Sequence, residues 1–427
     1  MRKQFLNLLN ILIFTGIKLS YQKVMKKIVL LFLAMSIAAC AQEKSIRISV
    51  TNTSNEIRKD EIVELSSNIV EKFKQKSFIV TDSKGLQVPY QITYDHKLIF
   101  PTTVNAKSST LYTIAAGKPD VFKKVVCGKH YPERIDDIAW ENNRIAFRTY
   151  GPALQKSGEK AYGCDIWVKC IAEPVVDLRY NLELGAQTKA KLAELNKTDK
   201  KAAQQFAESV SYHNDHGNGL DYYKVGPTLG AGTTALMDGD SIVYPYCYST
   251  YKILDNGPLR FTVKLTYNPI TIGNNSKIIE TRTISLDYGS QLNKVTVSYA
   301  NLTKSTPILT GIVIHSPSLD LQADANAGYI TYADPVDKVN GQIFVGAVFT
   351  KKIESAKPVL FSTKEKVQRD ADGHVAALSH YTPGSKYIYY AGAGWSKYGF
   401  KDSTEWNKYI RTFAQHLKQP LIIKIAK

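Results

Sequence analysis

The chain has few cysteines, and none of them are spaced for binding zinc. Among 427 residues there are five, Cys40, Cys127, Cys164, Cys170 and Cys247, and no two are separated by two residues. The absence of a Cys-x-x-Cys pair argues against a zinc knuckle. On one continuous strand Cys164 and Cys170 would lie about 20 Å apart, too far for a disulfide. We therefore expect buried thiols or at most one long-range disulfide.

Long hydrophobic runs are also missing. The apolar run from Ile28 to Ala39 is shorter than the about 20 residues that a membrane-spanning helix needs. It follows two lysines after Met25 and ends in Ala-Ala-Cys, the order of regions in a bacterial lipoprotein signal peptide. Residues 1–39 are thus interpreted as an over-extended start plus a signal peptide. Lipidation of Cys40 would anchor the protein to a membrane, in the periplasm or at the outer membrane.

Acidic residues are outnumbered by basic ones. The chain has 55 Lys and Arg against 38 Asp and Glu. Six of the basic residues and none of the acidic ones fall in residues 1–39, which leaves a net charge of +11 for the rest. A basic surface concentrates anions, and an exported protein does not meet nucleic acid, so we expect an acidic oligosaccharide as partner. Scattered, solvated lysines are the alternative.

What the sequence does contain is β-structure. Residues 45–118 hold short β-branched or aromatic runs separated by turn residues, which predicts an N-terminal β-sandwich. In residues 119–427 the strands lengthen and many alternate; in 260–267 the side chains of Phe261, Val263 and Leu265 would share one face. This predicts an all-β protein whose second domain is a large two-sheet sandwich carrying the chemistry.

Two helices are expected to interrupt the strands. Residues 186–209 are rich in Ala, Lys, Gln and Glu and polar nearly all round, which predicts one helical insertion on the surface. Residues 403–417 have apolar positions at helical spacing, with Ser403 as N-cap. The run PLIIKI then predicts a closing strand.

Two arginines at alternate positions are the first candidates for chemistry. In NRIAFRTYG, strand periodicity places Arg144, Ala146 and Arg148 on one face. Two guanidinium groups in register can bind a carboxylate or sulfate. The alternative is that they form structural ion pairs with Asp136, Asp137 or Glu141.

The most unusual stretch is residues 211–235, SYHNDHGNGLDYYKVGPTLGAGTTA. It lacks the Gly-Lys-Ser/Thr ending of a phosphate loop. A tyrosine beside a histidine, with a carboxylate to orient it, is suited to general acid–base chemistry. We expect Tyr212 or His213 to act as base and Asp215 to orient the histidine.

This stretch also allows two other interpretations. His213, His216 and Asp221 could converge on a metal, although a glycine-rich loop fixes no helical ligand spacing. The stretch could equally be a network of turn-forming residues. We expect it to line the catalytic cleft without an essential metal or cofactor, since functional residues concentrate on loops held by rigid sheets.

Other polar and aromatic residues near these motifs are predicted to bind substrate. Trp395 and Tyr398, in YYAGAGWSKYGF, could stack on sugar rings, or could form a corner of the core. The remaining predicted substrate-binding residues are Tyr150, His216, Asp221, Lys224 and His315.

Taken together, the motifs ERIDDIAWENNRIAFRTYGPAL, YHNDHGNGLDYYKVG, GPLR and GAGWSK resemble the domain-of-unknown-function 4861 family of Bacteroidetes lipoproteins. The similarity covers nearly the whole chain after residue 40. It implies a galactose-mutarotase-like β-supersandwich, related also to polysaccharide lyases, and a place in uronide-degrading gene clusters. It further implies dehydration of a terminal uronate in an oligosaccharide.

These observations predict a carbon–oxygen lyase, either a dehydratase or a β-eliminating lyase. It would remove the C5 proton of a uronate and expel the group on C4, giving a 4,5-unsaturated uronate. This step needs a base at the carbon and a cation for the developing enediolate, for which Arg144 and Arg148 are the candidates. The alternatives are a non-catalytic glycan-binding lipoprotein and a sugar epimerase or mutarotase.

Overall fold

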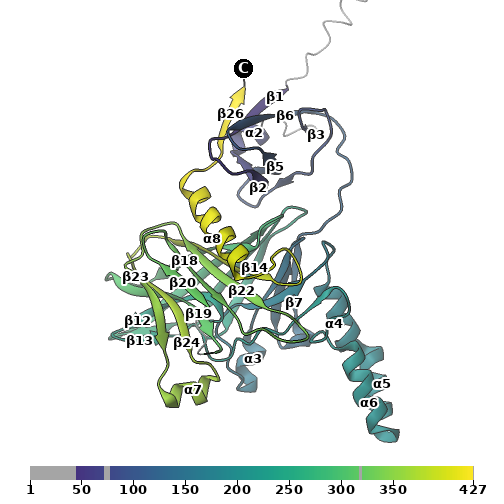
Figure 1. The fold of residues 1–427 in the computed structure, drawn as a ribbon, viewed down its shortest axis with the longest axis vertical. Helices are drawn as coiled ribbons and strands as arrows, with labels where there is room; N and C mark the ends of the chain where they lie inside the picture. The colour runs from purple at the N-terminus through teal and green to yellow at the C-terminus, as the bar shows by residue number, and fades with distance from the viewer. Residues whose placement is uncertain (1–44, 72–76, 317–319, 427) are drawn as a thin grey trace, which may run out of the picture.

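The computed structural model describes residues 45–71, 77–316 and 320–426, which form a small and a large β domain (Figure 1). Strands make up 46% and helices 18% of the structure, so the predicted all-β class is confirmed. The expected signal peptide and the lipidated Cys40 lie outside the described residues. No helix in the described ranges is long and apolar enough to cross a membrane.

The small domain is a sandwich of a four-stranded and a three-stranded sheet, as predicted. Its buried core includes Ile48, Val63, Phe100 and Ile114, contributed by both sheets. The strands are, in sheet order, β26 (Ile422–Ala426), β1 (Ile46–Asn52), β6 (Ser108–Ala116) and β3 (Phe78–Thr81), facing β2 (Arg58–Leu65), β5 (Leu98–Val104) and β4 (Gln91–Ile92).

The last strand belongs to the small domain, which corrects the expected division at residue 118. The predicted closing strand does form, but β26 pairs antiparallel with β1, so that Ile425 lies opposite Ile48. The chain therefore returns to its first strand after completing the large domain (Figure 1). A period-2 pattern predicts that a strand exists. It does not predict the partner strand, which depends on where the preceding helix α8 (Ser403–Lys418) ends in space.

The large domain is built from three antiparallel sheets that share one core. The nine-stranded sheet contacts both five-stranded sheets. Its strands are β14 (Tyr248–Asn256), β15 (Arg260–Tyr267), β17 (Asn275–Asp287), β18 (Leu292–Ala300), β25 (Tyr387–Trp395), β22 (Ile343–Phe349), β21 (Tyr329–Ala333) and β20 (Leu321–Asp324), with β16 (Ile270–Ile272) beside β17.

The two five-stranded sheets pack on the nine-stranded one. The first runs β13 (Ser241–Val243), β12 (Ala231–Asp238), β19 (Thr306–Ile314), β24 (Gly373–Tyr381) and β23 (Ser355–Leu360). The second, which carries the candidate site, runs β11 (Gly219–Leu220), β10 (Asp165–Lys169), β9 (Ile145–Thr149), β8 (Asp137–Glu141) and β7 (Cys127–Tyr131).

Alternation along the strands fills this core as the sequence predicted. On β15 the side chains of Phe261, Val263, Leu265 and Tyr267 are all buried in it, while Lys264 is exposed. The cysteines at 127, 164, 170 and 247 are free thiols, with no disulfide among the described residues.

The helices lie outside the sheets. Besides the short α2 (Ser67–Glu71) they are the 3-10 turn η1 (Pro132–Arg134), α3 (Pro152–Ser157), α4 (Val176–Leu184), α5 (Ala186–Thr198), α6 (Lys200–Val210), α7 (Thr363–Arg369) and α8 (Ser403–Lys418). Helix α8 buries Trp406 and Ile410 against β22. Helices α5 and α6 lie side by side and extend away from the domain (Figure 1).

Two predictions about the helices were wrong in detail. Residues 186–209 form two helices instead of one, because Asp199 leaves the helical conformation and caps α6 by accepting from the amides of Lys201 and Ala202. In α8 the N-cap is Asp402 and not Ser403; its carboxylate accepts from the amides of Thr404 and Glu405. Both errors have one cause: an aspartate at an N-cap satisfies amides that the helix itself leaves unpaired.

Candidate active site

The candidate site lies on the sheet of β7–β11, which has one apolar and one polar face. On β9 the side chains of Ile145 and Phe147 enter the main core, whereas Ala146 packs toward α4 together with Trp167 and Tyr180. Strand periodicity places Arg148 on the face of Ala146. The predicted alternation of this strand is confirmed, and it directs an arginine into the space under α4.

Arg148 is the centre of a buried ionic cluster. Its Nε donates to Asp165 Oδ2 at 2.9 Å, and one terminal nitrogen donates to the Tyr180 hydroxyl at 3.1 Å. The other, Nη2, lies 2.7 Å from Asp221 Oδ2, and Asp137 Oδ2 is 3.7 Å from Nε. Only 6% of the Arg148 side chain is exposed. Three carboxylates thus surround one arginine away from solvent.

Burial has a direct effect on two of these carboxylates. Loss of hydration raises the pKa of Asp137 to about 7, against the opposing effect of Arg148. The same cause raises the pKa of Asp221 to about 6. Asp137 Oδ1 is also buried without a hydrogen-bond partner in the described structure. One arginine therefore does not fully compensate the burial of Asp137 and Asp221.

The two arginines expected to act together are separated by these contacts. Arg148 forms ion pairs with buried carboxylates, including that of Asp137, which is the alternative of structural ion pairs. Arg144 lies before β9 and pairs with Asp60 of the small domain, with 3.2 Å between Nη2 and Oδ2. Arg144 therefore contributes to domain docking, as does Arg260, which pairs with Glu64 at 2.7 Å. The structure does not bring Arg144 and Arg148 together as a substrate clamp.

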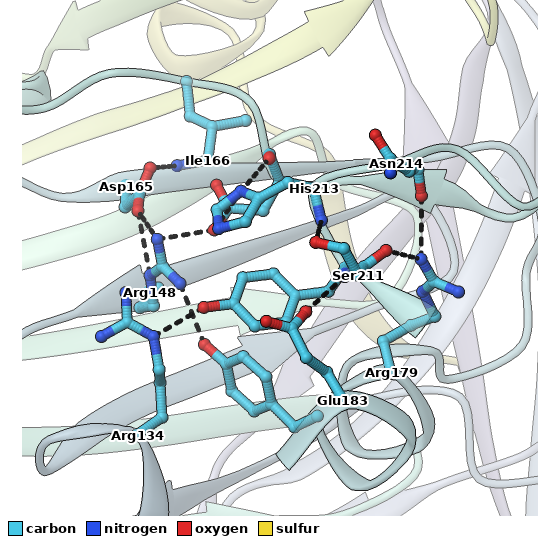
Figure 2. Close-up of polar contacts among 12 residues, drawn as sticks. Arg134, Arg148, Asp165, Ile166, Arg179, Glu183, Ser211, His213 and Asn214 are labelled. Atoms are coloured by element: carbon cyan, nitrogen blue, oxygen red, sulfur yellow. Dashed lines mark hydrogen bonds and ion pairs between the residues drawn. The ribbon is translucent and has the colours of Figure 1, made fainter. Parts of the chain in front are cut away.

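The first part of the 211–235 stretch is fixed to α4. Arg179 Nη2 donates to the backbone oxygens of Ser211 and Asn214 at 2.6 and 2.8 Å, and Glu183 Oε2 accepts from the Tyr212 amide at 2.7 Å. Figure 2 shows Arg179 on one side of this loop and Arg148 on the other. The loop is thus held from both sides by charged groups on regular elements.

Gly219 allows the loop to rejoin the sheet. Its φ is +105°, and a β-carbon there would lie 2.0 Å from the Val168 carbonyl oxygen. Only glycine therefore permits this approach of β11 to β10.

His213 has a half-exposed side chain with one ring nitrogen in a hydrogen bond. Its Nδ1 lies 2.7 Å from the backbone oxygen of Asp221, a group that can only accept, so Nδ1 carries the proton. Nε2 is then the unprotonated nitrogen of the neutral ring, and 52% of the side chain is exposed. The carboxylate of Asp221 lies 3.9 Å from Nδ1. This is the arrangement of a general base with its tautomer fixed.

Asp215, expected to orient the histidine, is engaged elsewhere. Its carboxylate accepts from the amides of Gly217 and Gly219 and lies 3.7 Å from Lys397 Nζ. The orienting role belongs to Asp221, which the sequence had assigned to substrate binding. The reason is local: Asp215 folds back on the two glycines that follow it, a common turn interaction of aspartate.

Tyr212 is buried beneath His213 and bonded to an arginine that the sequence analysis missed. The two rings lie 4.4 Å apart, and Tyr212 is only 3% exposed. Its hydroxyl accepts from Arg134 Nε at 2.7 Å (Figure 2). Burial raises the pKa of Tyr212 despite this cation, so the tyrosine remains protonated. Between the two candidates for a base, exposure and protonation favour His213.

Arg134 occupies a strained turn. The next two residues, Ile135 and Asp136, both have left-handed backbones, with φ of 55° and 61°. A β-branched residue rarely adopts this conformation, and such strain concentrates at functional sites. The turn places Arg134 between Tyr212 and Asp137, whose carboxylate lies 3.9 Å from Nη1. Its side chain is 18% exposed. The sequence YPERIDD gave no spacing signal for this role.

The other predicted substrate-binding residues are dispersed. Tyr150 is buried and donates to Asp165, His216 Nε2 bonds the Ser211 backbone oxygen at 3.0 Å, and Lys224 pairs with Asp370. His315 bonds Asp334 through Nδ1 and the Lys224 backbone oxygen through Nε2, both at 2.7 Å. Through the second contact, His315 supports the backbone of the 211–235 stretch.

The proposed aromatic platform is absent at Trp395, which is 2% exposed. Its indole N–H donates to the Asn340 backbone oxygen at 2.7 Å, and Tyr398 packs partly against the same core. The core-corner alternative therefore holds. Glycines around Trp395 allow close packing of β25, which is why the same motif suited both interpretations.

No group of three or more His, Cys, Asp or Glu residues suited to holding a metal occurs in the described ranges. In particular, His213 and Asp221 are close, but His216 bonds a backbone oxygen within its own loop.

This chain is similar to several known proteins. Two solved structures from Enterococcus faecalis, a glycosyl hydrolase family 38 protein and an alpha-mannosidase, align with TM-scores of 0.46 and 0.43 at 9% identity. They cover 90% and 91% of this chain, which spans about half of theirs (47% and 46%). The uncharacterized protein P7 of Formosa agariphila is 26% identical over 94% of this chain and all of its own length. The model of the domain of unknown function DUF4861 matches residues 50–423, and the chain therefore belongs to that family.

Proposed function

We propose that the protein is a carbon–oxygen lyase that acts on uronate-containing acidic oligosaccharides and forms a 4,5-unsaturated uronate. The observation that carries this proposal is the environment of His213. Its Nδ1 proton is held by the Asp221 backbone oxygen, which leaves Nε2 as the basic nitrogen of a half-exposed side chain. Arg134 donates to the hydroxyl of Tyr212, the tyrosine that packs against the histidine ring.

The chemistry follows from these positions. His213 Nε2 takes the C5 proton of the uronate, and the electron pair of the C–H bond moves toward the carboxylate as an enediolate. Arg134 is the cation assigned to this developing charge, in place of Arg144 and Arg148. The pair then forms the C4–C5 double bond and expels the oxygen on C4, to which the imidazolium returns its proton. The ring ends neutral.

Asp221 supports the imidazolium stage of this cycle. Its carboxylate lies 3.9 Å from Nδ1, opposite in charge to the imidazolium that forms. Tyr212 acts as a positioning residue, because it orients Arg134 and packs against the histidine. The leaving group is a hydroxyl in a dehydratase or a linked sugar in a lyase. Attachment to a membrane through Cys40, outside the cytoplasm, completes the proposal.

The experiment is a turnover assay with the purified chain and a panel of uronate-terminated oligosaccharides. Formation of the alkene conjugated to the carboxylate is followed by ultraviolet absorbance, and the product by mass spectrometry. Loss of water identifies a dehydratase, and chain cleavage a lyase. A change of the C5 or anomeric NMR signals without an alkene would instead identify an epimerase or mutarotase. Binding without any turnover would identify a glycan-binding protein.

Matched variants connect the activity to the site. His213→Ala should lower kcat by roughly 10²- to 10⁴-fold, the usual contribution of a general base. His380→Ala is its control, since His380 is an exposed histidine paired with Glu354 on another sheet. Equal activity of the two variants would refute the assignment of His213.

A further inference from the structure

A second group of aromatic side chains lies at the surface beside the other half of the 211–235 stretch. Tyr162, which precedes β10, has its ring 5.3 Å from that of Tyr244 and 5.1 Å from that of Tyr246. All three side chains are half-buried, so part of each ring remains in contact with water. Clustered apolar surface of this kind marks a binding site more often than scattered exposed side chains do.

An arginine adjoins the three tyrosines. The guanidinium of Arg369, at the end of α7, lies 4.4 Å from the ring centroid of Tyr244 and 5.2 Å from that of Phe361. One terminal nitrogen donates to the Pro227 backbone oxygen. The ion pair of Arg369 with Glu365 is long, 3.9 Å, so the guanidinium retains capacity for an anionic ligand.

This patch and the candidate active site are joined by the same elements. The Tyr162 amide donates to the Gly226 backbone oxygen, and Arg369 bonds Pro227, so both anchor the 211–235 stretch. Tyr162 lies three residues before Asp165, hence at most about 11 Å away along the chain. Asp165 contacts Arg148, which contacts Asp221 under His213.

We propose that Tyr162, Tyr244, Tyr246 and Arg369 form an accessory subsite for an acidic oligosaccharide. The C–H faces of the sugar rings would stack on the tyrosines, and Arg369 would pair with a carboxylate or sulfate. The substrate class rests on the proposed function. The subsite extends that function by assigning recognition of sugar units away from the reacting one, which the buried Trp395 does not supply.

The test measures binding and turnover separately. Binding is measured by calorimetry on the His213→Ala background, with oligogalacturonate, oligoalginate and chondroitin hexasaccharides and with cellohexaose as a neutral probe. Tyr162→Ala and Tyr246→Ala should each weaken the binding of an acidic oligosaccharide about tenfold, measured as an increase in Kd. Arg369→Gln should weaken the binding of acidic oligosaccharides about tenfold and leave any binding of cellohexaose unchanged. Thermal unfolding confirms that each variant is folded.

Surface residues of the same types serve as controls. Tyr94→Ala removes a half-exposed tyrosine of the small domain, and Arg411→Gln an arginine of α8; neither should alter binding. Unchanged binding in the patch variants, or no binding of any acidic probe, overturns the subsite. If the patch variants lose affinity but the wild type forms no alkene, the lyase proposal is refuted and the subsite is supported. If the wild type forms the alkene and the patch variants bind as wild type does, the lyase proposal is supported and the subsite is refuted.

Discussion

The Nη2 atom of Arg148, on β9, lies 2.7 Å from the carboxylate of Asp221, which follows β11. The contact is ionic without a well-aligned hydrogen bond, since Asp221 Oδ2 has no hydrogen-bond partner in the described structure. Through it, the residue whose backbone fixes His213 is tied to the centre of the sheet. A base on an exposed loop thereby acquires a rigid support, which catalytic geometry requires.

Removal of Arg148 should destabilise the protein more than it alters substrate recognition. Arg148→Met leaves three buried carboxylates without their central cation, and loss of one partner of a buried ion pair costs about 3–5 kcal/mol. The measurement is the free energy of unfolding from urea denaturation, with Arg411→Met as the surface control. A loss below about 1 kcal/mol would show that Arg148 is not the structural centre of the cluster.

Stability should also depend on pH through Asp137. Burial raises the pKa of its carboxyl to about 7, above the ordinary value of 3.8, so the folded state binds the proton more tightly than the unfolded state does. This group's contribution to stability is then favourable at low pH and is lost as pH rises from about 4 to 7.

Asp137→Asn removes that titration. Relative to wild type, the variant should therefore gain unfolding free energy on going from pH 5 to pH 8, as measured by denaturant titration at both values. Asp240→Asn, at an exposed turn, is the control and should show no such change. A difference between Asp137→Asn and wild type that stays constant with pH would contradict the raised pKa.

Trp395 should behave as a core residue. It is 2% exposed and its indole bonds Asn340, so Trp395→Ala should cost about 3–5 kcal/mol of unfolding free energy. Trp395→Phe should recover most of the packing and lose the hydrogen bond. If Trp395→Ala instead unfolds like wild type while losing affinity for oligosaccharides, the aromatic-platform interpretation would be right after all.

Alternation and turn residues predicted the strands of both domains, because side-chain period and burial are local properties. The same logic placed Arg148 correctly on its strand. What the sequence did not reveal are contacts between distant elements: the return of β26 to β1, the pairing of Arg144 with Asp60, and Arg134 beside Tyr212. Asp215 lies two positions and Asp221 eight positions after His213, and only the fold decides which of the two residues holds the histidine.

Arg179 should fix the conformation of the loop that carries His213. Its bonds to Ser211 and Asn214 fix the backbone on either side of the base, yet it touches no reacting atom in the proposed mechanism. Arg179→Met should lower kcat about tenfold or more, because a displaced base loses alignment, with a smaller change in KM. Amide hydrogen exchange of residues 211–214 should accelerate in the variant, whereas β12 should exchange as in wild type. Arg179→Lys can restore one of the two bonds and should recover part of kcat. A loss of kcat with unchanged exchange in the loop would mean that Arg179 acts by another route than positioning.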